Sequence, residues 1–471
     1  MKRKTKILYV SAELSPYASA GGLGEMGRSF TKALYDTGNY EVRRVMPLYK
    51  NINGDLKYLT DFPVRMRETF ETCIVKKNSN KKEFITYFLQ NDRYFYRENI
   101  YAYEDDGLRF FFFCRAVVEM LKRIKYRVDI VHINDWHTGF LAVLLKKEFP
   151  KVKTVFTIHN LSYHGFIEAS YLDGLLSREE QCRLGYPEWL NFMKAGICYS
   201  DLLTTVSPNY AKEIMTPHFS CGLLPLLKSR KDEIVGILNG VDYDIYDPSK
   251  DTELDFPYQY DSYHCKNKNK EKLREVYGLP QENKPLIVMI SRLNYEKGID
   301  LLLEALEFMD LTQFQFILLG SGNPYYQEKL SELAAKNPDW MKVEFSYSIQ
   351  LAKKLYAAAD IYLMPSKYEP CGLGQLYGMR YGAVPIVNPV GGLRDTVIEE
   401  EQCPKDYTGF HMKEWSTEAL MEAIQRAVTT YYQKDWHHYI TNGMKQDFSW
   451  TRSVMQYQKL YEKLLKKKDK V

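Results

Sequence analysis

Short apolar runs alternate with longer helical patterns along almost the whole chain, and this alternation restricts the fold more than any other feature. Serine and proline at 207 and 208 favour a helix start, because serine caps free backbone N–H groups and proline fits the first turn. Chains in which strands and helices alternate regularly form parallel sheets with helices on both faces, so we predict an α/β fold. In the first half the apolar runs are 7–10, 128–133, 154–158 and 202–206, and helical patterns follow the first two at 27–35 and 138–148.

The alternation stops once and then starts again, which predicts two domains. The pattern weakens between about Tyr243 and Pro285, where polar runs such as 246–251 and 267–272 replace it. A single hydrophobic core rarely grows to 471 residues. We predict two Rossmann-like domains, 1–245 and 246–446, facing a central cleft in which a ligand binds at the carboxyl ends of the strands. A helix at about 270–277 opens the second domain, and strands and helices then alternate over 286–290, 298–308, 314–319, 325–336, 343–345, 350–358 and 361–364.

Charge, apolar run lengths and cysteine spacing exclude several classes of protein. The formal net charge of +4 is too small to predict nucleic-acid binding. No run of about 18 apolar residues is present, and the basic start at Met1–Lys4 is followed by too short an apolar run for a signal peptide. The eight cysteines form no CxxC pair and no zinc spacing. We therefore expect a cytoplasmic protein with reduced thiols, no membrane association and no metal.

A glycine loop follows the first expected strand, at Gly21-Gly22-Leu23-Gly24. Glycines let the backbone approach a ligand closely, and the N-terminus of the following helix favours an anion. A tight strand-to-helix turn explains the loop equally well. No acidic residue for a ribose follows at the spacing of a dinucleotide-binding fingerprint.

Polar side chains follow two neighbouring strands where each strand ends. Asp135 comes directly after the run 128–133, and His159 follows 154–158. Because the carboxyl ends of parallel strands meet at one edge of a sheet, we expect both side chains in a ligand site. A single such histidine is more often structural, but two adjacent strand ends favour function.

The second domain carries a cationic loop and an acidic loop, each between a strand and a helix. Arg292 and Lys297 lie just before a helix, and two cations with free N–H groups can hold a diphosphate. Glu369 precedes the turn Cys371-Gly372-Leu373 at the start of another helix. Cys371 is better explained as a buried thiol than as a nucleophile, since no base lies near it in the sequence.

Taken together, these segments resemble the glycogen/starch synthase family of glycosyltransferases, which has the two-Rossmann GT-B architecture. The specific matches are Gly-Ile-Leu-Asn-Gly-Val-Asp at 236–242, Glu-Pro-Cys-Gly-Leu at 369–373 and Gln-Asp-Phe-Ser-Trp at 446–450. The resemblance implies retaining transfer of glucose from a nucleotide-diphosphate-glucose to the non-reducing end of an α-1,4-glucan such as glycogen. It also implies that the segment 447–471 forms a C-terminal helix that crosses back to the first domain.

The resemblance assigns roles to individual residues. The catalytic group would be Asp135, His159, Arg292, Lys297 and Glu369. Donor binding would fall to Ser19, Gly21, Gly22, Asn239, Tyr347, Cys371, Gly372, Leu373 and Thr396. Retention without an obvious enzyme nucleophile implies same-face attack, in which the protein stabilises charge on the leaving diphosphate. Two cations can supply that charge, so we predict neither a metal nor a cofactor.

One position departs from the family pattern. Ser19 stands where the family usually carries a lysine, so a donor-contacting cation is missing. This motivates an alternative, a non-catalytic glucan- or nucleotide-binding relative, although all five catalytic residues are present. A second alternative, a GT-B transferase acting on a sugar phosphate or a lipid, is disfavoured by the segment 369–373. The donor stays open between ADP-glucose, favoured by the resemblance, and UDP-glucose, because a stacked aromatic ring accepts either base.

Overall fold

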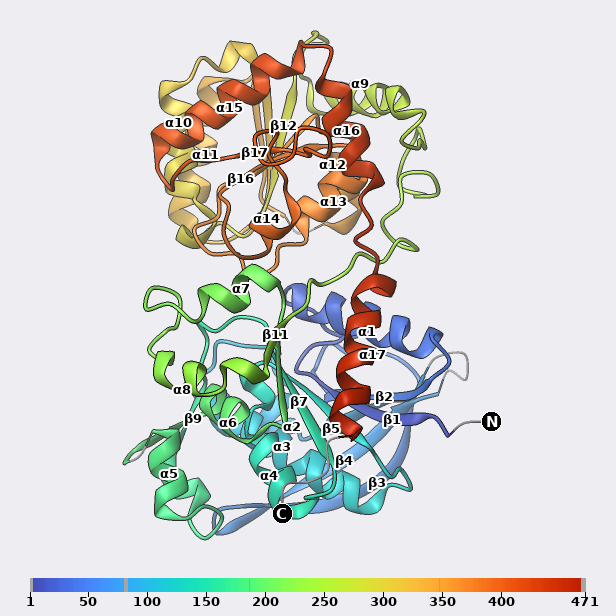
Figure 1. Ribbon diagram of the computed structural model, residues 1–471, viewed down its shortest axis with the longest axis vertical. Coiled ribbons are helices and arrows are strands. Elements are labelled where there is room, and N and C mark those ends of the chain that lie inside the picture. The colour runs from blue at the N-terminus through green and yellow to red at the C-terminus, as the bar shows by residue number, and fades with distance from the viewer. Residues whose placement is uncertain (1–2, 80–83, 186, 347, 467–471) are drawn as a thin grey trace. The chain divides into compact units, whose positions relative to one another are not determined.

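The chain folds into two compact units. A computed structural model describes residues 3–79, 84–185, 187–346 and 348–466 (Figure 1). One unit comprises Met1–Gly240 and Trp450–Val471, and the other comprises Val241–Ser449. The chain thus passes between units at 240/241 and again at 449/450, whereas the sequence pattern placed these boundaries at 245/246 and 446/447.

The first unit contains a nine-stranded sheet in the order β11-β10-β7-β6-β1-β2-β5-β4-β3 among the described residues. Seven strands form a parallel array, and the hairpin β3–β4 adds an antiparallel edge next to β5. A separate two-stranded sheet pairs β8 with β9. The strands are β1 Thr5–Val10, β2 Tyr40–Pro47, β3 Leu56–Met66, β4 Thr69–Asn78, β5 Thr86–Gln90, β6 Ile130–Asn134, β7 Lys153–Ile158, β8 Phe166–Glu168, β9 Trp189–Asn191, β10 Leu202–Thr205 and β11 Ile234–Gly236.

Amphipathic helices cover this sheet. In α3 the run Phe110–Phe113 is wholly buried, because α3 packs between α4 and the edge strand β3. Helix α7 begins as the sequence predicts, since the Ser207 side chain accepts from the Tyr210 N–H and Pro208 occupies the first turn. The helices are α1 Gly22–Asp36, α2 Asp92–Phe95, α3 Asp106–Arg123, α4 Phe140–Glu148, α5 Arg178–Leu184, α6 Phe192–Tyr199, α7 Pro208–Glu213, α8 Leu224–Ser229 and α17 Trp450–Lys466.

Helix α17, at the end of the chain, is part of the first unit. It packs beside α1, where the ring of Phe30 lies 4.7 Å from that of Tyr457. The Tyr461 hydroxyl is 2.6 Å from Nδ1 of His132 in β6, and the Ser453 hydroxyl donates to the Leu238 carbonyl. The predicted C-terminal helix that returns to the first domain is therefore confirmed. No described helix has the length and apolar character needed to cross a bilayer.

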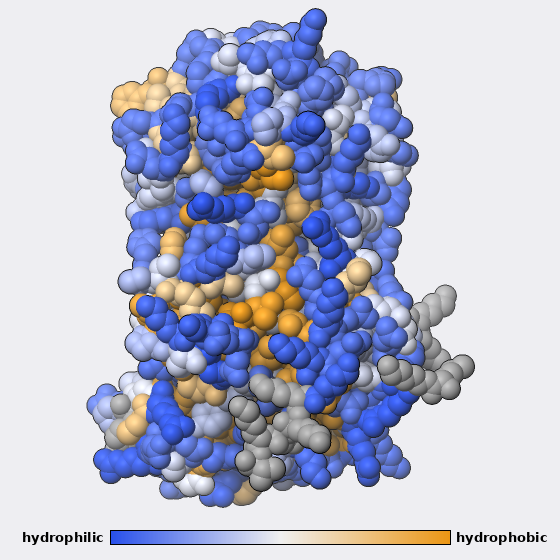
Figure 2. Space-filling model, in the orientation of Figure 1, coloured by the Kyte–Doolittle hydropathy of each residue, from blue (hydrophilic) through white to orange (hydrophobic). Residues whose placement is uncertain are grey.

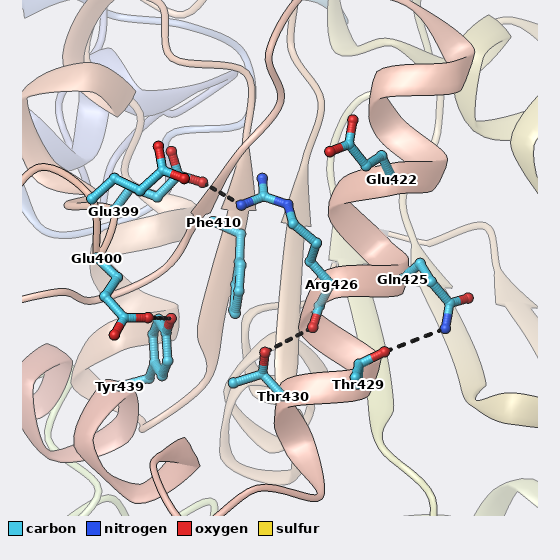
Figure 3. Close-up of a pocket in the computed structure, with 10 residues that line it drawn as sticks. Glu399, Glu400, Phe410, Glu422, Gln425, Arg426, Thr429, Thr430 and Tyr439 are labelled. Atoms are coloured by element: carbon cyan, nitrogen blue, oxygen red, sulfur yellow. Dashed lines mark hydrogen bonds and ion pairs between the residues drawn. The ribbon is translucent and has the colours of Figure 1, made fainter.

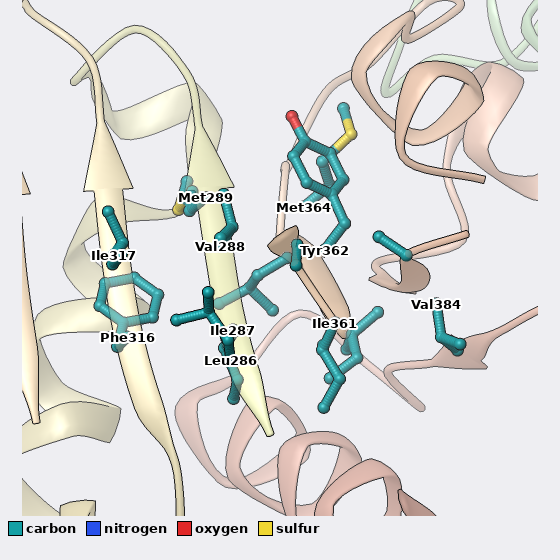
Figure 4. Close-up of a cluster of buried hydrophobic side chains, with 14 of the residues drawn as sticks. Leu286, Ile287, Val288, Met289, Phe316, Ile317, Ile361, Tyr362, Met364 and Val384 are labelled. Atoms are coloured by element: carbon teal, nitrogen blue, oxygen red, sulfur yellow. The ribbon is translucent and has the colours of Figure 1, made fainter. Parts of the chain in front are cut away.

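The second unit contains a six-stranded, fully parallel sheet in the order β14-β13-β12-β15-β16-β17, counted over the described residues. Its central strands are apolar on both faces, as expected for a parallel sheet covered on both sides. Figure 4 shows side chains of β12, β13 and β15, among them Ile287, Phe316 and Ile361, packed in this core. The strands are β12 Leu286–Ile290, β13 Gln315–Leu319, β14 Met341–Glu344, β15 Ile361–Met364, β16 Val384–Val387 and β17 Phe410–His411.

Helix α9, the first of the second unit, is anchored by buried polar contacts. Lys266 Nζ donates to the carbonyls of Tyr356, Ala357 and Tyr381, and Lys270 pairs with Asp360 at 2.9 Å. Most of the surface drawn in Figure 2 is hydrophilic. The helices are α9 Lys266–Tyr277, α10 Ile299–Phe308, α11 Pro324–Lys336, α12 Ile349–Ala358, α13 Gly374–Arg380, α14 Gly391–Thr396, α15 Thr417–Tyr431 and α16 Trp436–Lys445.

Candidate active site

Each large sheet has one point where its strand order reverses. In the first unit the reversal lies between the neighbouring strands β1 and β6. The strand after β1 in the chain, β2, pairs on the far side of β1, and the strand after β6, β7, pairs on the far side of β6. In the second unit the reversal lies between β12 and β15. Loops at the carboxyl ends of such strand pairs diverge and leave a crevice, where open α/β sheets bind ligands. The predicted site residues fall mainly on these loops.

Asp135 follows β6 directly and has an unusual backbone. Its φ of 60° lies in the region that non-glycine residues rarely adopt. Its carboxylate accepts from the Trp136 N–H at 3.1 Å and caps the short helix Trp136–Thr138. The side chain is only 7% exposed, and burial raises the pKa of the carboxyl to about 8. Below that pH Asp135 is a neutral acid that can donate a hydrogen bond.

His159 follows β7, the strand beside β6. Its Nε2 lies 3.1 Å from the Asn134 side-chain oxygen, which orients the ring. Burial lowers the pKa of His159 to about 3, so the imidazole is neutral at physiological pH. His137 is neutral for the same reason and stacks on Tyr101, with ring centroids 4.6 Å apart. The structure thus brings Asp135 and His159 to adjacent strand ends as uncharged hydrogen-bonding groups.

Glu13, just beyond the end of β1, belongs to the same cluster, and the sequence analysis did not single it out. One carboxylate oxygen accepts from the Ala20 N–H at 2.6 Å and the Gly21 N–H at 3.1 Å. The other accepts from the Tyr101 hydroxyl at 2.6 Å. Glu13 therefore holds the glycine loop against the strand end. An acidic residue at the end of the first strand was the available signal.

The glycine loop contains Ser19, the position that departs from the family pattern. Its hydroxyl donates to the Gly21 carbonyl at 2.9 Å, so this hydrogen bond stabilises the conformation of the glycine loop. A Cβ at Gly24 would lie 2.7 Å from the Ser19 hydroxyl, so this glycine lets the loop close on α1. Gly21 precedes α1 as its N-cap, Gly22 begins α1, and Asn239 is a buried residue just after β11. These four predicted donor-binding residues all belong to the first unit.

In the second unit, Lys297 and Glu369 form an ion pair across the strand reversal. Lys297 ends the short helix Tyr295–Lys297 after β12, and Glu369 lies on the loop after β15. The Ser366 hydroxyl also donates to Glu369, at 3.3 Å. Arg292 is exposed on the same loop as Lys297. Lys297 and Glu369 thus meet at one sheet edge, and Arg292 lies on the loop that carries Lys297.

Glycine geometry allows the two loops to approach each other. Gly298 has a φ of 72°, and a Cβ there would overlap the Pro365 carbonyl. Gly391, with a φ of 47°, packs on the Glu369 carbonyl in the same way. At both positions any side chain would be strained and would push apart the backbone that carries Lys297 or Glu369.

The turn at Cys371–Leu373 is fixed by Gln375, whose side-chain amide donates to the carbonyls of Cys371 and Gly372. The same amide donates to the Thr396 hydroxyl at 3.2 Å, which joins the turn to α14. Thr396 is buried and its hydroxyl donates to the Gly392 carbonyl, so this hydroxyl is used in a contact within the unit. Tyr347, the predicted base-stacking residue, lies outside the described residues.

A pocket elsewhere in the second unit has a volume of about 460 Å³ and contains none of the predicted site residues. Figure 3 shows that Arg426 from α15 points toward Glu399, with which it forms an ion pair at 2.8 Å. Its lining is Glu399, Glu400, Glu401, Phe410, Glu422, Gln425, Arg426, Thr429, Thr430 and Tyr439. Within the part of the chain that the structure describes, no group of three His, Cys, Asp or Glu side chains could hold a metal ion.

Solved structures with the same fold define the class. The catalytic domain of starch synthase IV from Arabidopsis thaliana, bound to ADP and acarbose, superposes with a TM-score of 0.92 at 30% identity. The match covers 99% of this chain and 100% of that one. Sucrose-phosphate synthase from Thermosynechococcus elongatus shares the fold at a TM-score of 0.65 and 20% identity. The chain is a glycosyltransferase of the two-Rossmann GT-B class, as the sequence predicts.

Matches to family models and to related proteins narrow the assignment from the GT-B class to one family. Residues 6–229 match the starch synthase catalytic domain, and residues 269–446 match the group 1 glycosyl transferases. Glycogen synthase of Moorella thermoacetica is 40% identical over 481 residues, covering 99% of this chain and 98% of the relative. Glycogen synthase of Thermotoga maritima is 37% identical, with coverage of 98% and 99%. The chain belongs to the glycogen/starch synthase family, and the predicted resemblance is confirmed.

Proposed function

We propose that this enzyme transfers glucose from ADP-glucose to the non-reducing end of an α-1,4-glucan, with retention of the anomeric configuration. The observation that carries the proposal is the ion pair of Lys297 and Glu369 at the strand reversal of the second sheet, with Arg292 on the loop of Lys297. Cations at such a crevice suit a diphosphate, and a carboxylate beside them suits sugar hydroxyls. The ADP described in the starch synthase IV structure supports an adenine nucleotide.

The proposed reaction needs charge stabilisation more than a nucleophile. The bond between glucose C1 and the diphosphate oxygen breaks, and the acceptor O4 attacks C1 from the same face. The departing phosphate oxygen takes the proton of the acceptor hydroxyl, so charge and atoms balance. Lys297 and Arg292 stabilise the negative charge that grows on the diphosphate, and Glu369 orients the glucose.

In this mechanism Asp135 and His159 recognise the uncharged part of the donor. The carboxyl of Asp135, with a pKa of about 8, donates to a glucose hydroxyl at neutral pH. His159, with a pKa of about 3, offers one ring nitrogen while Asn134 engages the other. Neutral partners satisfy hydroxyls without the cost of burying a charge. We assign the enzyme to the cytoplasm, in keeping with eight cysteines that form no disulfide.

The departure at Ser19 favours a second candidate, a relative that binds glucan or nucleotide without transferring glucose. Incubating the protein with glycogen and ADP-glucose, or with glycogen and UDP-glucose, separates the candidates. We expect ADP release and incorporation of labelled glucose into glycogen, both abolished by Glu369→Ala. A matched variant far from the site, Glu282→Ala, controls for loss of a carboxylate. Release of UDP alone would reassign the donor, and no transfer from either donor would support the binding protein.

A further inference from the structure

The loops that carry Lys297 and Glu369 are joined on their solvent side by one lysine and two aromatic rings. Lys367 Nζ donates to the Tyr295 hydroxyl at 3.0 Å and lies 4.7 Å from the centroid of that ring. It also lies 4.6 Å from the ring centroid of Trp415. The two rings meet edge to face, with centroids 5.4 Å apart. We call Tyr295, Lys367 and Trp415 the lysine clamp.

The lysine clamp connects three segments that are far apart in the sequence. Tyr295 begins the short helix that ends at Lys297, Lys367 lies two residues before Glu369, and Trp415 precedes α15. Two hydrogen bonds reinforce it. The Lys367 N–H donates to the Glu296 carbonyl at 2.8 Å, and the Trp415 indole N–H donates to the Pro365 carbonyl at 2.9 Å. Each aromatic member therefore lies against the loop that carries Lys367.

These contacts set the separation of the two loops rather than their individual folds. Tyr295 is 50% exposed, so its contact with Lys367 lies at the surface of the unit and outside its core. Lys297 and Glu369, which meet across the same two loops, are only 16% and 12% exposed. A shift of one loop against the other would move the Lys297 ammonium relative to any bound diphosphate, and displacements of about 1 Å can cost rate heavily.

We propose that Lys367 is a positioning residue for glucosyl transfer, which fixes the loop of Lys297 against the loop of Glu369 through Tyr295 and Trp415. The inference rests on the proposed function, because the ligand that Lys297 meets is the diphosphate of the donor. Lys367 itself contacts the neighbouring loop and acts on the donor only through Lys297.

The first test compares substitutions within the lysine clamp with a matched pair elsewhere. Lys367→Gln removes the cation, Lys367→Arg keeps it, and Tyr295→Phe keeps the ring but removes the hydroxyl. The control is Lys284→Gln, since Lys284 lies 4.0 Å from the Trp340 ring centroid, just before β12 and therefore at the opposite sheet edge. Initial rates over ranges of donor and glycogen give kcat and both KM values, and calorimetry gives the affinity for ADP.

We expect Lys367→Gln to lower kcat/KM for the donor about two- to fivefold, the factor that an exposed cation–π contact supplies. ADP affinity should fall by a similar factor, while the glycogen KM and Tm match those of Lys284→Gln. Lys367→Arg should restore the wild-type values. Equal kinetics for Lys367→Gln and Lys284→Gln, or a loss that arginine does not rescue, would overturn the proposal.

A double-mutant cycle tests whether Lys367 acts through Lys297. In a Lys297→Ala background, Lys367→Gln should have no further effect on ADP affinity, because the group it positions is gone. The same factor in both backgrounds would mean that Lys367 acts independently and would overturn the proposal. If the wild type transfers no glucose at all, the proposed function fails, and the ADP affinities of the four proteins still decide whether Lys367 positions Lys297.

Discussion

The two clusters of proposed ligand-binding residues differ in their electrostatics. In the first unit, Asp135 and His159 are held in their neutral forms, with pKa values of about 8 and about 3. In the second unit, Lys297 and Glu369 form an ion pair at partly exposed positions. Desolvation explains the first pattern, because burial without a counter-ion favours the uncharged form of any group. In the second cluster, an ammonium lies beside a carboxylate.

The difference matches the two halves of a sugar nucleotide. Sugar hydroxyls need hydrogen-bond donors and acceptors, and neutral groups provide them at low desolvation cost. A departing diphosphate gains negative charge, which only fixed cations or amide dipoles offset. In the proposed mechanism the first cluster recognises the sugar and the second stabilises charge, and each of the following experiments changes one of these two roles.

Lys297→Ala should produce the largest effect. Removing a group that stabilises transition-state charge typically lowers the rate about 10²–10³-fold. We expect that loss in kcat, with little change in glycogen binding measured by co-sedimentation. Arg292→Ala tests the exposed cation in the same way, and Lys284→Ala is the control. A variant with near wild-type kcat at saturating donor would remove that cation from the mechanism.

Asp135→Asn tests the neutral cluster through stability. The folded pKa of about 8 exceeds the value of 3.8 for an exposed carboxyl, so between these pH values the unfolded chain releases a proton that the folded protein keeps. Stability is therefore lost as pH rises through this window. The advantage of the variant should grow from about pH 4 to pH 8, by at most about 1.4 kcal/mol per pH unit, and then level off.

Calorimetric Tm values of wild type and Asp135→Asn across this range provide the measurement. Asparagine keeps the shape of the side chain, so it adds no backbone strain that Asp135 does not already carry. A Tm difference that does not change with pH would show that the Asp135 carboxyl is solvated and charged, and the contrast between the units would disappear.

His159→Gln should show the opposite dependence of stability on pH, with a smaller change. The folded pKa of about 3 lies below the 6.5 of an exposed imidazole, so the unfolded chain binds a proton that the folded protein rejects. Wild-type stability should therefore fall, relative to the variant, as pH drops from about 6.5 toward 3. Because His159 is less deeply buried than Asp135, we expect a smaller change in Tm. Parallel Tm curves would contradict a neutral His159.

Ser19→Lys should give the smallest effect and the only gain in donor binding. If the glycine loop approaches the diphosphate, an added ammonium should lower the donor KM by up to about tenfold, equal to about 1.4 kcal/mol. Ser19→Met controls for the longer side chain. The gain should shrink at higher ionic strength if the site stays wet. An unchanged or raised donor KM in the lysine variant, at both salt concentrations, would mean that this loop does not meet the diphosphate.

The strand ends were predictable because buried parallel strands read as continuous apolar runs, which the sequence analysis could locate. It placed Asp135 and His159 after such runs, and Lys297 and Glu369 between strands and helices, as the structure has them. The edge hairpin β3–β4 was missed, because most side chains of β3 are exposed and leave no apolar run.

The sequence analysis missed Glu13 and the lysine clamp, because their roles depend on contacts across the fold. Glu13 accepts a hydrogen bond from the Tyr101 hydroxyl, 88 residues away along the chain. Lys367 reaches Tyr295 across 72 residues, and Trp415 comes from a third segment. Composition and spacing give information only about residues that are close in the sequence, so they cannot identify partners from distant segments.

The position of α17 has a consequence for synthesis of the protein. The first unit needs Trp450–Lys466, but the ribosome makes the whole second unit before this helix. At roughly 5–20 residues per second, the delay is on the order of 10 s or more. During that time the apolar surface of α1 around Phe30, which α17 covers, stays open to chaperones or to other chains. The unit that begins first is thus the last to be completed.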